Sequence, residues 1–275
     1  MPVIIKRLTK QGLVDVEFDA DSLQEAAKYE PRAGVYTVSN TYERTKTLLF
    51  DAHLDRLEDS AQREGFALDY ERKQLKAALR EMIIESNHGD VRFRISVPAQ
   101  SPEEMILSIE PFQAPSPQLI EAGARCITST MARHNPASKS SEWMHRRQAL
   151  EAAQPADIYE TFLLDPRGNL LEGASSNVYA ILDGELLTAA AGVLAGISRM
   201  IVLEVCENIV PLRSTAPNIA DIDCFSEAFL SSSSRGLIPV VELDGAPIGD
   251  GRVGATTLAL RKAYQRWVSA HLEEL

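Results

Sequence analysis

The chain has 275 residues, enough for one large domain or two modest ones, and its 45% hydrophobic and 24% charged residues support a core without disulfides or metals. The net charge of −11 argues against binding to nucleic acid, and no apolar run reaches the length that spans a bilayer. The N-terminus lacks the pattern of a secretion signal and the three cysteines fit no disulfide framework, so we expect a cytoplasmic protein.

The first part of the chain is predicted to mix strands and helices. Alternating apolar residues predict strands at 3–7 and 14–18, and a hairpin formed by 34–42 and 45–50. A helix follows with Asp51 as its N-cap and Gly65 as its end, and apolar residues at helical spacing predict a second helix over 70–86. Residues 90–97 and 104–112 are then expected to form another strand pair.

A proline-rich segment is the best candidate for a boundary between domains. Residues 111–118 read PFQAPSPQ, with three prolines in eight residues, which is typical of a linker. We therefore expect a small domain over 1–113, a linker over 114–118 and a large domain over 119–275.

The second part is predicted to be mostly strands joined by tight turns. The expected elements are strands at 124–131, 159–165, 168–173, 176–182, 185–190, 227–232 and 237–245, and helices at 140–153, 197–208 and 256–273. Because the strands pair with their neighbours through short turns, an antiparallel α+β fold is favoured over a doubly wound parallel sheet.

Lysine is scarce in the later part of the chain. Only Lys139 and Lys262 follow residue 76, and Lys262 lies in a predicted amphipathic helix where a solvated lysine is ordinary. Lys139 stands where a turn meets a predicted helix, close to the positive end of the helix dipole. An exposed lysine at a helix start is one interpretation. A nucleophilic lysine is the other, because lysine amines form Schiff bases with carbonyls, including pyridoxal phosphate.

A pyridoxal phosphate site would need donors for the phosphate and an acid for the pyridine nitrogen. Gly196, Ile197 and Ser198 open a predicted helix and offer backbone N–H groups and a hydroxyl. The serine run at 231–234 and Arg56 are further candidates for the phosphate, and Glu172 is a candidate acid beside small residues. Each of these features alone also fits a structural role.

Arginines supply candidates for binding a substrate carboxylate. Alternation along 91–97 places Arg92 and Arg94 on one face of a strand, where bidentate bonds to a carboxylate are possible. A solvated outer face is the alternative. Arg133, shortly before Lys139, is equally suitable. No His, Cys or acidic pair has the spacing of a metal site, so we expect no metal.

Together these segments resemble the class IV (fold type IV) pyridoxal-phosphate aminotransferases, a group with D-amino-acid and branched-chain aminotransferases and aminodeoxychorismate lyase. The matching blocks follow the family's order and cover most of the chain: GVYTV at 34–38, HLDRLEDSA at 53–61, KSSEW at 139–143, LEGASSNVYAI at 171–181, LLTAAAGVLAGISRMIVLE at 186–204 and EAFLSSSSRGLIPVVELDG at 227–245. The resemblance implies an α+β protein with a small α/β domain, a larger pseudo-barrel domain and a site between them. It also implies a homodimer.

The resemblance implies a role for each matching residue. Lys139 would form the Schiff base with pyridoxal 5'-phosphate and move the proton, and Glu172 would bind the pyridine nitrogen. Tyr36 would face the substrate. The remaining cofactor contacts would come from Arg56, Gly196, Ile197, Ser198 and Ser233 at the phosphate, and from Ser175, Ser176 and Asn177 around the ring.

Departures from the family pattern leave the substrate open. The acid that usually follows the aromatic position is Thr37, the usual Thr-Pro pair of the second hairpin is Thr188-Ala189, and serines replace threonines near 232–234. We expect transamination between an amino acid or amine and a 2-keto acid. The alternatives are elimination of pyruvate by a lyase of the aminodeoxychorismate type, a non-catalytic binding role, and a serine hydrolase, for which no Gly-x-Ser-x-Gly motif is present.

Overall fold

The computed structural model describes residues 3–275 and divides into two compact units. Within that range, unit 1 comprises the residues up to 113 together with 138–146 and 271–275, and unit 2 comprises 114–137 and 147–270. The first break lies in the proline-rich segment where we expected a boundary. Residues 138–146 and the C-terminal residues belong to unit 1, although they are distant from it in sequence.

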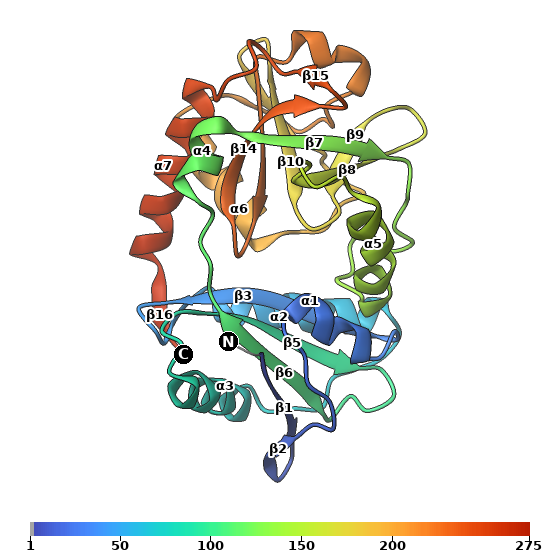
Figure 1. Ribbon diagram of the computed structural model, residues 1–275, viewed down its shortest axis with the longest axis vertical. Helices are drawn as coiled ribbons and strands as arrows, with labels where there is room; N and C mark the ends of the chain where they lie inside the picture. The colour runs from blue at the N-terminus through green and yellow to red at the C-terminus, as the bar shows by residue number, and fades with distance from the viewer. Residues whose placement is uncertain (1–2) are drawn as a thin grey trace. The chain divides into compact units, whose positions relative to one another are not determined.

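Unit 1 is built on an antiparallel sheet of seven strands, ordered β16-β4-β3-β5-β6-β1-β2 (Figure 1). The strands are β1 Ile4–Thr9, β2 Gly12–Asp15, β3 Gly34–Tyr42, β4 Lys46–Leu48, β5 Val91–Pro98, β6 Met105–Pro111 and β16 Leu272–Glu274. The alternation expected along β5 is confirmed, because Val91, Phe93, Ile95 and Val97 are all buried on one face.

Two helices cover that face of the sheet. They are α2 Phe50–Arg63 and α3 Arg72–Ser86, and their apolar residues form one cluster with those of the strands. The opposite face packs against the short helix α1 Leu23–Ala26, which η1 Ala27–Tyr29 continues. The Ser22 side chain caps α1 by accepting the Glu25 N–H at 3.1 Å.

Both ends of the C-terminal region differ from our expectation. The predicted helix over 256–273 ends at Ala270 as α7 Ala255–Ala270, and the last residues add β16 to the edge of the unit 1 sheet. Helix α2 begins at Phe50 rather than after an Asp51 cap, because Leu49 precedes it in a left-handed conformation. Glu273 Oε1 accepts the Phe50 N–H at 2.7 Å, so β16 supplies the cap that Asp51 was expected to provide.

Unit 2 contains a closed ring of six strands in the order β10-β13-β14-β7-β8-β9, with β9 pairing back to β10. These strands are β7 Ala124–Ser129, β8 Glu160–Leu164, β9 Leu170–Gly173, β10 Asn177–Leu182, β13 Glu227–Ser232 and β14 Gly236–Leu243. The α+β class and the expected barrel are confirmed. Strand β7 nevertheless pairs in parallel with both β8 and β14, where tight turns had favoured antiparallel pairing throughout.

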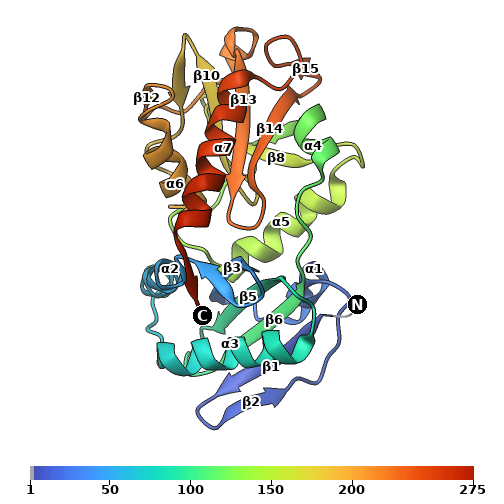
Figure 2. The ribbon, with the colours of Figure 1, turned by 90° about the vertical axis from the view of Figure 1, so that its left-hand side faces the viewer.

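Helices α6 Ile197–Cys206 and α7 lie side by side along the barrel (Figure 2), and Trp267 Nε1 of α7 donates to Glu204 Oε1 of α6 at 2.6 Å. The remaining elements are α4 Pro117–Ala122, α5 Ser141–Ala153, β11 Glu185–Leu187, β12 Leu212–Arg213, η2 Ile219–Cys224 and β15 Ala246–Pro247. Helix α4 occupies part of the segment expected to be a linker. No helix among residues 3–275 is long and apolar enough to cross a bilayer.

Two neighbouring isoleucines on α3 test the packing of unit 1. Ile83 is fully buried in the cluster, whereas Ile84 is 43% exposed. We expect Ile83→Ala to lower the free energy of unfolding by about 2 to 5 kcal/mol, because it removes methyl groups from a closed core. The matched variant Ile84→Ala should change it by about 0.5 kcal/mol or less. Urea unfolding measures both, and equal losses would contradict this packing.

Candidate active site

The backbone of Lys139 is held on both sides within unit 1. Its N–H donates to Ser60 Oγ at 3.1 Å, and its carbonyl oxygen accepts the Tyr36 N–H at 3.0 Å. Ser60 lies on α2 and Tyr36 on β3, so two separate elements fix the lysine. The Nζ atom lies over the buried Tyr36 ring, 4.7 Å from its centroid. Tyr36, which we expected to face the substrate, thus contacts Lys139.

Arg56 on α2, expected to bind the phosphate, forms a polar cluster with Thr37 and His53. Arg56 Nη2 donates to Thr37 Oγ1 at 3.2 Å and lies 3.4 Å from His53 Nδ1, which is 2.9 Å from Thr37 Oγ1. A guanidinium only donates, so Nδ1 is an acceptor and the neutral imidazole carries its proton on Nε2. Burial, and then the charges of Arg56 and Lys139, hold the pKa of His53 well below 6.5. The cluster therefore carries its positive charge on Arg56.

In unit 2, the carboxylate of Glu172 on β9 is buried and accepts two hydrogen bonds. Arg133 Nη1 donates to Oε1 at 2.8 Å, and the Leu194 N–H donates to Oε2 at 3.0 Å. The Glu172 and Arg133 side chains are only 4% and 6% exposed. A buried carboxylate needs such partners, because burial alone would make its charge unfavourable. Arg133, which we expected to bind a substrate carboxylate, is thus committed to Glu172.

A turn of small residues over 189–196 connects Glu172 to the start of α6. The Leu194 carbonyl oxygen accepts the Asn177 side-chain amide at 3.1 Å and the Gly196 N–H at 2.8 Å. A Cβ at Gly196 would overlap the side-chain oxygen of Asn177, so only glycine fits there. Asn177, expected beside the cofactor ring, holds this turn.

The first turn of α6 presents backbone donors without a capping side chain. Its N-cap is Gly196, and the first N–H groups of a helix have no intrahelical acceptor. The helix dipole favours an anion at this end. Ile197 and Ser198 are both buried there, and Ser198 Oγ accepts the Ser231 hydroxyl at 3.2 Å. Ser233, also expected at the phosphate, lies in the turn between β13 and β14.

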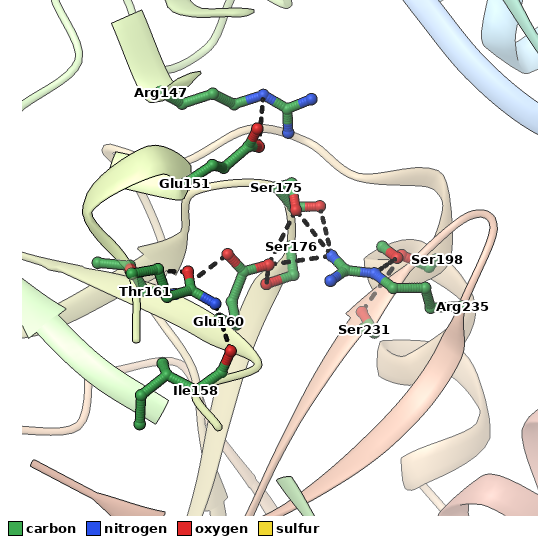
Figure 3. Close-up of polar contacts among 12 residues, drawn as sticks. Arg147, Glu151, Ile158, Glu160, Thr161, Ser175, Ser176, Ser198, Ser231 and Arg235 are labelled. Carbon is green, nitrogen blue, oxygen red and sulfur yellow. Dashed lines mark hydrogen bonds and ion pairs between the residues drawn. The ribbon is translucent and has the colours of Figure 1, made fainter. Parts of the chain in front are cut away.

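Ser175 and Ser176 contact two residues that the sequence analysis did not identify, Glu160 and Arg235 (Figure 3). Both serine hydroxyls donate to Glu160 Oε2, at 2.9 and 3.2 Å, and Arg235 Nη2 donates to the same oxygen at 3.0 Å. Arg235 also donates to the Ser175 carbonyl oxygen at 3.0 Å. Its position directly after the serine run was an available signal. Glu160 had none, because its partner is 75 residues away in sequence.

The structure corrects our expectation for Arg94. Its guanidinium forms a buried ion pair with Glu30 and donates to the Leu23 carbonyl oxygen at 2.6 Å. These bonds leave it no role as a ligand for a substrate carboxylate. The physical reason is that α1 and η1 cover the sheet face that we expected solvent or substrate to reach. Arg92 differs, since it donates to Glu110 at 3.3 Å while 41% of its side chain stays exposed.

Comparisons with known proteins place this geometry in a wider group. A family model described as amino-transferase class IV matches residues 34–243. The D-alanine aminotransferase of Listeria monocytogenes serotype 1/2a (strain 10403S) is 27% identical, over 98% of this chain and 99% of that protein. The branched-chain-amino-acid aminotransferase of Pseudomonas aeruginosa is also 27% identical, over 85% of this chain and 82% of that protein.

Solved structures share the fold at lower identity. A branched-chain amino acid aminotransferase of the organism abbreviated T.th., solved with pyridoxamine 5'-phosphate, superposes with a TM-score of 0.80 at 20% identity, covering 98% of each chain. The Escherichia coli branched-chain amino acid aminotransferase gives 0.79 at 19% identity, again covering 98% of each chain. These likenesses establish the fold.

The lowered pKa of His53 predicts how stability depends on pH. The unfolded chain binds a proton at this residue near pH 6.5 and the folded chain does not, so acidification favours unfolding. We expect His53 to reduce the free energy of unfolding by up to about 1.4 kcal/mol per pH unit below pH 6.5. Urea unfolding between pH 7.5 and 5.5 should therefore show a shallower dependence in His53→Gln than in the wild type. Equal slopes would show that His53 is protonated when folded.

Proposed function

The chain belongs to the class IV aminotransferases, and we propose that it works with pyridoxal 5'-phosphate bound through Lys139. It is a transaminase, which moves an amino group from a donor to a 2-keto acid. The observation that carries the proposal is the fixed backbone of Lys139, whose amine lies against the Tyr36 ring. A lysine held in this way presents its amine with little loss of side-chain freedom on reaction.

The donors in unit 2 suit an anion and a protonated ring nitrogen. The uncapped first turn of α6 offers the N–H groups of Ile197 and Ser198 to a phosphate, and we assign Ser198 Oγ, Ser233 and Arg56 to the same group. Glu172 is kept ionised by Arg133 and the Leu194 N–H, so it can accept a hydrogen bond from a pyridinium N–H. These residues fit pyridoxal 5'-phosphate.

When bound, pyridoxal phosphate supplies an electron sink that weakens the Cα–H bond of an amino acid. Lys139 Nζ first holds the cofactor and, once displaced by the substrate amine, takes the Cα proton as a general base and returns it on the other side of the transfer. The Glu172 carboxylate holds the ring nitrogen in its protonated form. Ser175 and Ser176, tied to Glu160 and Arg235, keep the segment after β9 in place.

We propose an aliphatic α-amino acid as the donor. The support is that the relatives reported above are named for D-alanine and branched-chain amino acids, and neither is named as a lyase. Arg92, with its exposed guanidinium, is the arginine that we assign to the substrate carboxylate. From the family resemblance we also propose a cytoplasmic homodimer, which light scattering during size-exclusion chromatography would test.

Two lysine variants test the role of Lys139. Wild-type protein with pyridoxal phosphate is expected to show a visible absorption band that borohydride removes, and Lys139→Ala should lack it. Lys262→Ala is the matched control, because Lys262 is exposed on α7 and should leave the band unaltered. A band of full size in Lys139→Ala would contradict the assignment.

Separate additions of amino donors test the reaction. We expect D-alanine or L-leucine to bleach the wild-type band without a keto acid present, because the amino group passes to the cofactor, and a keto acid to restore it. L-glutamate and an (R)-amine serve as comparison donors. Bleaching by the amine alone would contradict an amino acid donor. Catalytic pyruvate release from aminodeoxychorismate without any acceptor would instead indicate the lyase.

A further inference from the structure

Three buried hydroxyl groups form a chain that ends at the start of α6. Tyr179 Oη on β10 lies 3.0 Å from Ser231 Oγ on β13, and Ser231 Oγ lies 3.2 Å from Ser198 Oγ in the first turn of α6. Figure 3 shows the contact between the two serines. Tyr179 and Ser231 are fully buried, and Ser198 is 2% exposed. Water therefore has little access to these groups.

The Tyr179 ring is fixed by its packing. It stacks on Phe229, with the ring centroids 4.5 Å apart, and Phe229 is its partner across the β10–β13 pair. The phenol oxygen is consequently held beside Ser231 by the strand register and the ring contact. Burial also raises the pKa of Tyr179 above its ordinary value, so the phenol keeps its proton.

The number of protons sets the direction of the chain. Each hydroxyl has one proton to donate, and that of Ser231 is donated to Ser198 Oγ. Tyr179 must then be the donor to Ser231. Among residues 3–275, the Ser198 hydroxyl has no acceptor for its own proton, although its oxygen is already occupied by Ser231. This proton is thus available to an anion at the α6 N-terminus, beside the backbone donors described above.

We propose that Tyr179 is a positioning residue, which acts through Ser231 to direct the Ser198 hydroxyl proton toward the cofactor phosphate. The inference rests on the proposed function, since the phosphate is that of pyridoxal phosphate. Tyr179 itself touches neither cofactor nor substrate. A phenylalanine at this position would keep the ring packing and would leave Ser231 without its donor, so that Ser231 and Ser198 can exchange donor and acceptor roles.

Equilibrium binding of two cofactor forms to the apoprotein tests this role. Tyr179→Phe is expected to weaken pyridoxal phosphate binding about 3- to 10-fold, the effect of one hydrogen bond, and to leave binding of pyridoxal, which lacks the phosphate, unaltered. Tyr70→Phe is the matched control. It removes a phenol that donates to Glu58 in unit 1 at 2.7 Å, and should change neither affinity.

A double-mutant cycle shows whether the effect passes through Ser198. Ser198→Ala should weaken pyridoxal phosphate binding on its own, and adding Tyr179→Phe should then cost nothing further. Additive losses would overturn the proposal, as would equal losses for pyridoxal and its phosphate or full affinity in Tyr179→Phe. If the wild type binds no pyridoxal phosphate at all, the proposed function fails first. The ³¹P NMR shift of the bound phosphate should also differ between wild type and Tyr179→Phe.

Discussion

The buried carboxylate of Glu172 is the constraint on which the arrangement of unit 2 depends. Charge in a protein interior is unfavourable unless it is paired and hydrogen-bonded, and this carboxylate obtains both from residues distant in sequence. Arg133 brings the segment after β7 to it, and the Leu194 N–H brings the 189–196 turn. Because that turn leads directly into α6, the acid and the anion-binding helix start are positioned by the same set of bonds.

The same solution recurs elsewhere in the chain. Glu160 is paired with Arg235 in unit 2, and Glu30 with Arg94 in unit 1. Removing one partner from such a pair leaves a buried charge uncompensated, which is far costlier than losing an exposed ion pair. The Glu160 pair joins two turns that carry proposed cofactor residues, whereas the Glu30 pair closes the sheet face under α1. Buried ion pairs therefore serve positioning in one unit and packing in the other.

Local patterns predicted most elements, because alternation and helical spacing record which face of an element is buried. What they could not supply is pairing between distant segments. β16 and the parallel partners of β7 follow from the global fold, and Glu160 meets Arg235 only through the barrel. Arg94 was misjudged because a helix of four residues covers it. The Ser22-x-x-Glu25 spacing was the available signal for that helix, since it is typical of an N-terminal cap.

The central claim is that Lys139 is the residue that bonds pyridoxal phosphate, and peptide mapping tests it most directly. The protein would be loaded with the cofactor, reduced with borohydride, digested and analysed by mass spectrometry. The account predicts one phosphopyridoxyl group per chain, on the peptide that contains Lys139. A label on Lys262 or on a lysine of the first 76 residues, or no stable label at all, would contradict it.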